Sequence, residues 1–280
     1  MIRYSIWWTK RFVVLLPGIV IAYLSVRDIF PYIHHRLHFS GLAVFVTYML
    51  AAYVLLPAII RLIRIINPPD HLPLYCVTPD GFASDPLNIG VISTRLELIQ
   101  TMEKAGWQVA DRHNLKNVLR VIASVIINRP YPTAPISSMF LFGRKQDLAF
   151  EQSVEGNAAS RHHVRFWATT YSGKTPLNVR AIHWQHRQTH VQGDNLLWVG
   201  AASLDVGISL IRHNLQFTHM VDPDTGRERD LLVSQLRGAG VVGKVSTVRL
   251  GQAYRLLNRV WNGSLHSDGQ MTIVSLRHKS

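Results

Sequence analysis

The densest group of side chains that could do chemistry is the segment Arg161–Trp167, which reads Arg-His-His-Val-Arg-Phe-Trp. Its pattern predicts a strand, and successive side chains on a strand point to opposite faces. His163, Arg165 and Trp167 would then share one face, while His162 and its apolar neighbours would point to the core. Arginine offers paired donors and histidine a tunable one, so the cationic face could bind a phosphate or a carboxylate.

Acidic residues that could complete a site follow later in the chain. Asp205 ends a run of small and apolar residues, so it is either buried against an arginine or directed at a ligand. His219 precedes Asp222 and Asp224, and either aspartate could cap the helix predicted after them. Glu228, in the first turn of that helix, suits the positive end of the helix dipole.

Together these residues could form a metal site or a general acid–base set. No standard motif supports either, because the chain has no H-E-x-x-H, no G-x-S-x-G and no Walker loop. We favour a structural network of arginines and carboxylates over a ligand site, and a ligand site over an active centre with His163, Asp205 and His219 as catalytic residues. The predicted ligand-binding residues are Arg161, His162, His163, Arg165, Asp205, His219, Asp222, Asp224 and Glu228. Metal binding stays open, and the sequence identifies no cofactor.

Other residues that often bind metals are interpreted as structural. Cys76 is the single cysteine, which excludes an internal disulfide and a multi-cysteine zinc site and favours a small buried thiol. His183, His186 and His190 would align on a helix, but their polar neighbours favour an exposed insertion.

The charge distribution narrows the classes of partner. The formal net charge is +13, of which residues 1–69 carry +6 and the remainder +7. A charge of this size attracts polyanions weakly and without selectivity. No compact run of Lys and Arg has interleaved aromatic residues, so nucleic acid is not an expected partner.

Two apolar runs near the N-terminus predict transmembrane helices. Residues 12–26 carry no charge and follow Trp7 and Trp8, and residues 39–60 are uncharged throughout. A helix of about 20 apolar residues crosses a bilayer, and tryptophan favours the headgroup level. Lys and Arg are more numerous outside the two runs than between them, which favours cytoplasmic termini. We therefore expect a multi-pass membrane protein whose partners include the lipid bilayer.

The chain is predicted to divide into three parts. Residues 1–66 form the membrane anchor, the proline-rich residues 67–86 an extended linker, and residues 87–280 a soluble domain. Strand and helix patterns in the soluble domain do not alternate regularly. This favours an α+β fold resembling a mixed α/β sandwich over a doubly wound sheet.

Several elements of the domain can be located. Thr94 and Glu97 have the spacing of a capping box, which predicts a helix up to Gly106. Its apolar side is predicted to consist of Leu96, Ile99, Met102 and Trp107. Strands are predicted at 88–93, 139–142, 148–150, 163–167, 196–205, 243–250 and 271–277, with the second and third joined as a hairpin. Further helices are predicted from Asn114 to Arg129 and over 228–236.

A series of motifs in order resembles the LssY-type C-terminal domain over about residues 85–240. The motifs are Asp85-Pro-Leu-Asn88, Ala105-Gly-Trp107, Arg129-Pro-Tyr-Pro-Thr-Ala-Pro135, Leu141-Phe-Gly-Arg144, Gln146-Asp-Leu-Ala-Phe150, Arg161–Trp167, Trp198-Val-Gly-Ala-Ala202, Asp205-Val-Gly207 and Asp222-Pro-Asp224. The resemblance implies a bacterial inner-membrane protein related to a component named in type I secretion, with no assigned biochemical role and no catalytic residues to transfer. The chain lacks the signature of the lipid phosphatases to which such domains are often fused.

Two functions follow as expectations. The first is a membrane-tethered cytoplasmic domain that binds a partner protein or an anionic ligand, as an accessory component of an envelope or secretion-related complex. The alternative is a hydrolase that acts on a phosphorylated or lipid-linked substrate through the His, Asp and Arg cluster. Convergence of His163, Arg165, Asp205 and His219 around an open pocket would favour the hydrolase.

Overall fold

The computed structural model divides the chain into two compact units. The described residues are 20, 23–37, 40–56, 58–59, 72–79, 81–111, 117, 131, 133, 135–154, 160–173, 177, 195–210, 217–257 and 264–277. One unit comprises residues 1–68 and 79–82, and the other comprises residues 69–78 and 83–280.

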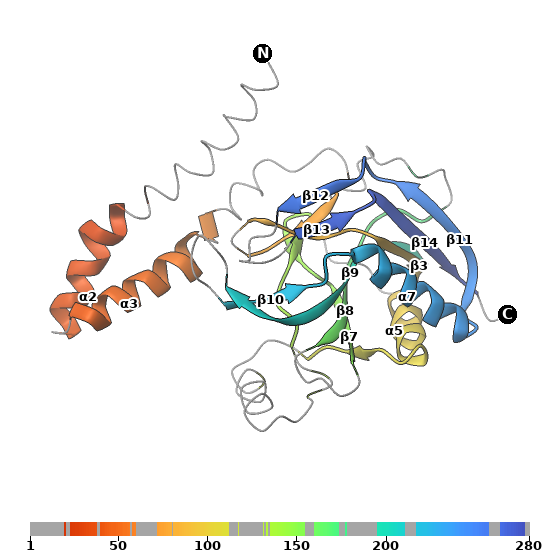
Figure 1. The fold of residues 1–280 in the computed structure, drawn as a ribbon, viewed down its shortest axis with the longest axis horizontal. Coiled ribbons are helices and arrows are strands. Elements are labelled where there is room, and N and C mark those ends of the chain that lie inside the picture. The colour runs from red at the N-terminus through yellow and green to blue at the C-terminus, as the bar shows by residue number, and fades with distance from the viewer. Residues whose placement is uncertain are drawn as a thin grey trace, which may run out of the picture. The chain divides into compact units, whose positions relative to one another are not determined.

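Residues 20–59 of the N-terminal unit are helical where the structure describes them (Figure 1). The π-helix η1 (Ser25–Ile29) continues into α2 (Phe30–Leu37), and α3 (Ser40–Leu50) continues into the π-helix η2 (Ala51–Leu55). The segment that was expected to connect two membrane spans is therefore helical as far as Leu37.

The prediction of two transmembrane helices is wrong for the described residues. None of the helices there is both long enough and apolar enough to cross a bilayer. α3 has 11 residues and η2 has 5, so together they rise at most about 24 Å, less than a hydrocarbon core of about 30 Å. η1 and α2 carry Arg27, Asp28 and Arg36 within one helical stretch. The multi-pass inner-membrane location rested on these helices and is contradicted by the same finding, while residues 12–19 lie outside the described part of the chain.

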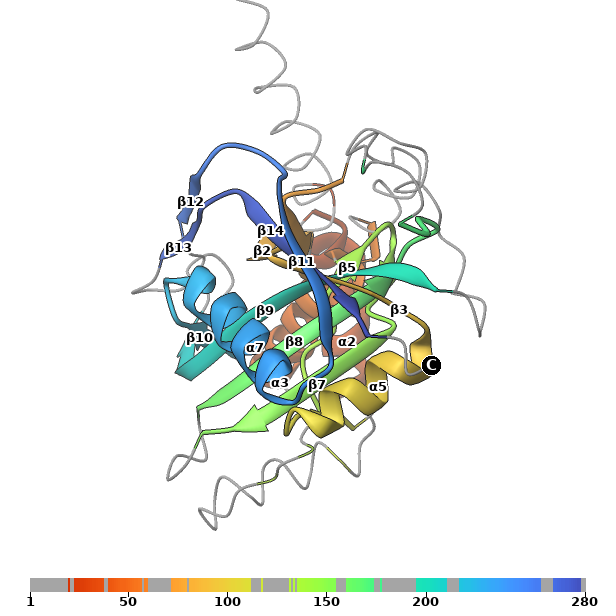
Figure 2. The same cartoon turned by 90° about the vertical axis from the view of Figure 1, so that its right-hand side faces the viewer.

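A mixed sheet forms the centre of the second unit (Figure 2). Its strand order is β11-β14-β3-β9-β8-β7-β4, and β10 also pairs with β9. β14 and β3 run parallel, and the other pairs are antiparallel. The strands are β3 (Ile89–Ser93), β4 (Gln108–Val109), β7 (Leu148–Ser153), β8 (Arg161–Ala168), β9 (Leu196–Leu210), β10 (Phe217–Val221), β11 (Val242–Arg249) and β14 (Gln270–Leu276).

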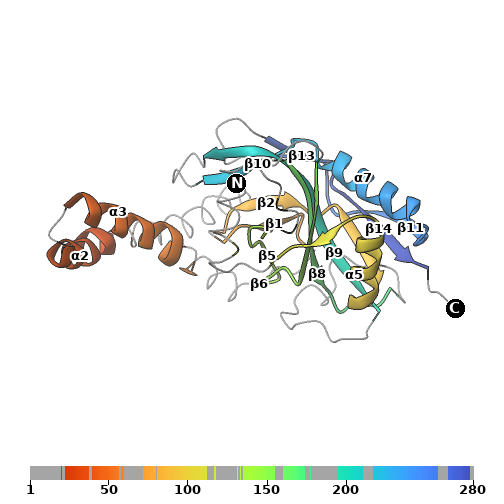
Figure 3. The ribbon, with the colours of Figure 1, turned by 90° about the horizontal axis from the view of Figure 1, so that it is seen from below.

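Two of the described helices cover one face of this sheet. α5 (Arg95–Lys104) and α7 (Thr225–Gly238) lie on the same side, as Figure 3 shows. Leu98 and Leu232 from these helices pack with Phe166 of β8 in one hydrophobic core. Burying such side chains contributes roughly 2 kcal/mol each, so this core fixes the helices on the sheet.

A smaller sheet covers the other face. Its strand order is β2-β1-β5-β6, and Cys76 and Leu141 from it pack against Trp167 and Val199 of the large sheet. A separate pair joins β12 to β13. These strands are β1 (Tyr75–Val77), β2 (Ala83–Pro86), β5 (Phe140–Leu141), β6 (Arg144–Lys145), β12 (Tyr254–Leu257) and β13 (Ser264–Ser267). β1 and β2 lie inside the range that the sequence assigned to an extended linker.

The local predictions differ in outcome. The capping box at Thr94 and Glu97 is confirmed, but Leu96 is 63% exposed and Leu98 takes its place in the core. The predicted hairpin is wrong: β5 pairs with β6 around Phe142 and Gly143, whose positive φ angles suit a tight hairpin turn, and β7 pairs with β8 instead. Most of the helix predicted from Asn114, and all of His183, His186 and His190, lie outside the described residues.

Candidate functional site

Strand β8 divides the predicted site residues between the two faces of the large sheet. The predicted alternation is confirmed: Trp167 packs in the core beneath the small sheet, whereas Phe166 packs in the core beneath α5 and α7. His163 and Arg165 therefore lie on the face of the small sheet, and His162 lies on the face of α7. Two groups of polar residues result, and they have different surroundings.

The first group is a buried charge chain. It consists of Asp85, Glu151, Arg161, His163, Arg165, Asp205 and His219. Arg165 donates from Nη1 to Asp85 Oδ2 at 2.8 Å and from Nε to the Ser137 carbonyl at 3.2 Å. His163 lies between two aspartates, with Nε2 3.7 Å from Asp85 Oδ2 and Nδ1 3.5 Å from Asp205 Oδ1.

The remaining members extend this chain from the interior to the surface. Nδ1 of His219 lies 3.7 Å from Asp205 Oδ2, and the His219 side chain is 40% exposed. Arg161 donates from Nη1 to Glu151 Oε2 at 3.1 Å, and it faces Asp205 across the β8–β9 pair. Arg161 and Arg165, the two arginines of the predicted cationic face, thus each have a carboxylate of the buried charge chain beside them.

The surroundings of this chain shift the pKa values of three groups. Burial alone would raise the pKa of Asp85, but the interactions with the nearby His163 and Arg165 outweigh it and hold that pKa below its usual range. Burial lowers the pKa of His219; Asp205 opposes the decrease, and the nearby cations, first Arg161, add to it. Burial, with Asp85 nearby, raises the pKa of Cys76, as expected for a structural thiol.

Burial keeps ligands away from the centre of the buried charge chain. His163, Arg165 and Asp205 are between 2% and 4% exposed. Neither ring nitrogen of His163 has a hydrogen-bond partner among the described residues, nor does the buried hydroxyl of Ser203, which faces it on β9. Within the described ranges no three His, Cys, Asp or Glu residues are arranged to hold a metal ion. The buried charge chain therefore has the geometry of a structural ionic network.

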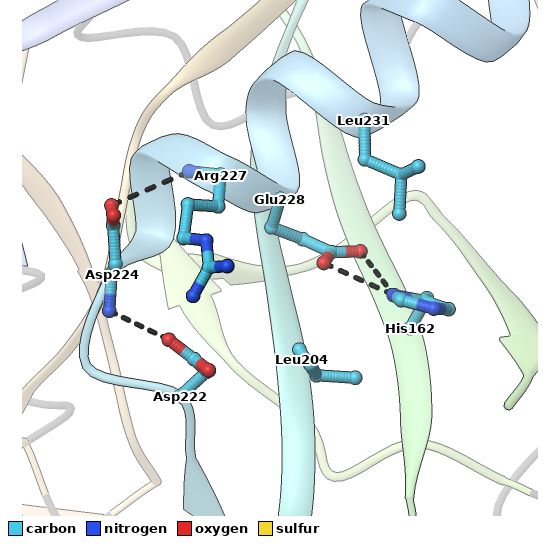
Figure 4. A pocket seen from close by; sticks show the side chains of 7 residues that line it. All are labelled: His162, Leu204, Asp222, Asp224, Arg227, Glu228 and Leu231. Atoms are coloured by element: carbon cyan, nitrogen blue, oxygen red, sulfur yellow. Dashed lines mark hydrogen bonds and ion pairs between the residues drawn. The ribbon is translucent and has the colours of Figure 1, made fainter.

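The second group lines an open pocket beside α7. Its volume is about 330 Å³, and its walls come from β8, β9, the turn after β10 and the first two turns of α7 (Figure 4). The lining residues are His162, Leu204, Asp222, Asp224, Arg227, Glu228 and Leu231. The buried Asn88 helps to place these elements, because its side-chain amide donates to the carbonyls of Thr225 and Ala202 at 2.9 Å.

A histidine and a glutamate form the base of this pocket. Nδ1 of His162 lies 2.9 and 3.0 Å from the two carboxylate oxygens of Glu228, as Figure 4 shows. Glu228 is buried, and the edge of Trp107 packs against the imidazole ring at 6.4 Å between centroids. When the imidazole is neutral, Nδ1 carries the hydrogen toward the carboxylate and Nε2 is left as an acceptor. Nε2 has no hydrogen-bond partner among the described residues.

Two aspartates form the rim of the pocket. Oδ1 of Asp224 accepts from the backbone N–H groups of Gly226 and Arg227, which confirms the predicted helix cap. Oδ1 of Asp222 accepts from the backbone N–H of Asp224 at 2.8 Å, and the Asp222 N–H donates to the carbonyl of Leu204. Arg227 also lines the pocket, and it is exposed.

Sequence reasoning missed several residues of both groups. Asp85 belongs to a motif of the resemblance but carries no sign of its pairing with Arg165, which is 80 positions away. Glu151 faces His163 only through the β7–β8 register. Leu204 and Arg227 lie next to predicted residues, so the alternation of β9 and the first turn of α7 could have identified them.

Comparisons with known proteins place the chain in a family. No curated protein and no solved structure matches it. A family model described as LssY C-terminus matches residues 70–271, which is more than half of the chain. The predicted resemblance is thereby confirmed, and the chain belongs to the LssY C-terminus family.

Proposed function

We propose that this LssY C-terminus domain is a binding module that holds part of a partner molecule in the pocket beside α7. The observation that carries the proposal is the contrast between an open cavity of about 330 Å³ and a buried charge chain on the opposite face. Pockets that combine apolar walls with a few convergent polar groups are typical ligand sites. Such binding fits an accessory component of an envelope or secretion-related complex.

The cationic face of β8 is not the proposed binding site. An anionic ligand there would have to displace Asp85 from Arg165, and both side chains are about 3% exposed. Breaking such a pair leaves a buried charge without its partner, which costs several kcal/mol. Binding in the pocket requires no such rearrangement, because the polar groups that line it already face the cavity.

Site-specific crosslinking tests the proposal. A photoreactive amino acid at Leu231, a pocket residue, should give a crosslinked product in cells that express the full-length chain. The same amino acid at Leu96, an exposed apolar position on α5, provides the matched control. Glu228→Gln, which alters the base of the pocket, should reduce the product at Leu231. Equal labelling at the two positions would contradict binding at the pocket.

Hydrolysis is a second candidate, and one contact favours it. Glu228 orients His162 in the way that a carboxylate orients a general base, and the free Nε2 could take a proton from water. The expected catalytic residues His163 and Asp205 are buried and lend no support to it. Turnover of p-nitrophenyl phosphate or p-nitrophenyl acetate that is lost in His162→Gln would favour the hydrolase over the binding module.

A further inference from the structure

We infer that the group held in the pocket is a cation at the end of an apolar stem, such as a lysine or arginine side chain or an alkylamine. This inference rests on the proposed function and specifies its ligand. It follows from the charges, the hydrogen-bonding capacity and the shape of the pocket.

The charges that line the pocket favour a cation. Asp222, Asp224 and Glu228 contribute three carboxylates against the one guanidinium of Arg227. This acidic site lies in a chain whose formal net charge is +13, so the pocket differs from the average surface of the protein. Opposite charges raise the rate of encounter and fix the orientation of a ligand, whereas an anion would meet three like charges.

The positive end of α7 does not offset this preference. Helix N-termini bind anions through backbone N–H groups that have no partner within the helix. Here Oδ1 of Asp224 already accepts from the N–H groups of Gly226 and Arg227. An anionic ligand would have to displace this cap, so the end of the helix is not open to it.

The pocket offers three acceptor atoms to a ligand, beside the exposed donors of Arg227. Asp222 and Asp224 each bond through Oδ1, and their Oδ2 atoms have no partner among the described residues. When its imidazole is neutral, His162 adds Nε2 as a third acceptor, because its other ring nitrogen donates to Glu228. Ammonium and guanidinium groups have several donors and no acceptor, which complements this set.

The apolar walls and the size of the pocket select the rest of the group. Leu204 and Leu231 line the cavity together with the charged residues. Lysine and arginine place an aliphatic stem against apolar surface while the charged head meets polar groups. A volume of about 330 Å³ is at the lower end for ligand sites, so it suits one such side chain or a small amine and not a large ligand.

A matched set of small probes tests the ligand class. Butylamine, butylguanidine, butyrate and butanol share a four-carbon stem and differ in the head group, and each can be titrated into the full-length chain by NMR. We expect the amine and the guanidine to bind, and butyrate and butanol not to bind. Asp222→Asn should weaken amine binding about fivefold, by loss of one charge. Asp230→Asn, which removes an exposed carboxylate on the same helix, should leave it unchanged.

Each other outcome counts against a defined part of the inference. Butyrate binding as tightly as butylamine would overturn the cationic class while the pocket remained a binding site. Amine binding that is insensitive to Asp222→Asn would overturn the placement in the pocket. No binding of any probe, together with no crosslink at Leu231, would overturn the proposed function itself. A short lysine-containing peptide that binds more tightly than butylamine would identify a protein partner, and the reverse order a free amine.

Discussion

His162 and His163 are neighbours in the chain, yet they meet opposite surroundings. His163 lies 2% exposed between Asp85 and Asp205, and its ring nitrogens contact no solvent. His162 is hydrogen-bonded through Nδ1 to the carboxylate of Glu228 at the base of an open pocket. Both belong to pairs of histidine and carboxylate, so residue type alone does not separate them. The face of the sheet decides which pair is structural and which is available to a ligand.

Stability and binding are expected to depend on different residues. A charge buried with its partner costs little extra, but the same charge left alone costs several kcal/mol. A charge at the rim of a pocket keeps its contact with water, so removing it changes stability by a few tenths of a kcal/mol. Substitutions in the buried charge chain should therefore lower the stability of the fold, and substitutions in the pocket should change what the protein binds.

The largest effect is expected for Arg165→Met. The methionine removes the closest charged partner of Asp85, which lies about 3% exposed, and leaves this buried carboxylate only the weaker contact with His163 at 3.7 Å. We expect the free energy of unfolding in urea to fall by about 3–5 kcal/mol. Arg229→Met is the control, because Arg229 pairs with the more exposed Asp230 and Asp268 and should cost less than about 1 kcal/mol. A similar loss for both variants would remove the distinction between buried and exposed pairs.

Asp224→Ala should have a smaller effect, because Asp224 serves both the pocket and the helix. Its Oδ1 caps α7, and losing a cap costs about 1 kcal/mol. Asp224→Ser keeps a capping oxygen without the charge, so it should preserve the thermal midpoint while weakening binding of butylamine. If Asp224→Ser were as unstable as Asp224→Ala, the charge and not the cap would stabilise the helix.

Local rules predicted part of both regions. The alternation of β8 placed His162 and His163 on opposite faces, and the spacing around Asp224 identified the cap of α7. These features depend on neighbours within a few residues, which a sequence displays directly. The capping box at Thr94 was correct for the same reason. The apolar side of that helix was predicted less well, because the helix turns Leu98 toward the sheet and leaves Leu96 exposed.

Long-range pairing could not be predicted in the same way. Asp85 meets Arg165 only after the small sheet has closed over β8, and Glu151 meets His163 only in the observed register. Which face of β8 stays open depends on what α7 and the small sheet cover, and no local pattern contains that information. The membrane prediction was wrong for the described residues because it rested on the hydropathy of each run, whereas none of the helices described there is both long enough and apolar enough to cross a bilayer.

The pH dependence of stability should be smaller and should involve the buried charge chain. Because the folded state lowers the pKa of His219, the unfolded state binds this proton first as pH falls below about 6.5, and stability decreases. The lowered pKa of Asp85 acts at more acidic pH: its contribution is present above the unfolded pKa and is lost as pH falls through the folded one. Urea denaturation of His219→Gln at pH 7, 6 and 5 should show a shallower decrease than the parent chain, and an unchanged slope would contradict this assignment.

The smallest effect on stability is expected for Asp222→Asn. The side chain is partly exposed, and the asparagine oxygen can still accept from the backbone N–H of Asp224. We therefore expect the free energy of unfolding to change by less than about 0.5 kcal/mol in the same urea experiment that measures Arg165→Met. A loss of more than about 1 kcal/mol would mean that the rim of the pocket supports the fold as the buried charge chain does. The difference between these two variants is thus the direct measure of whether β8 separates a structural face from a binding face.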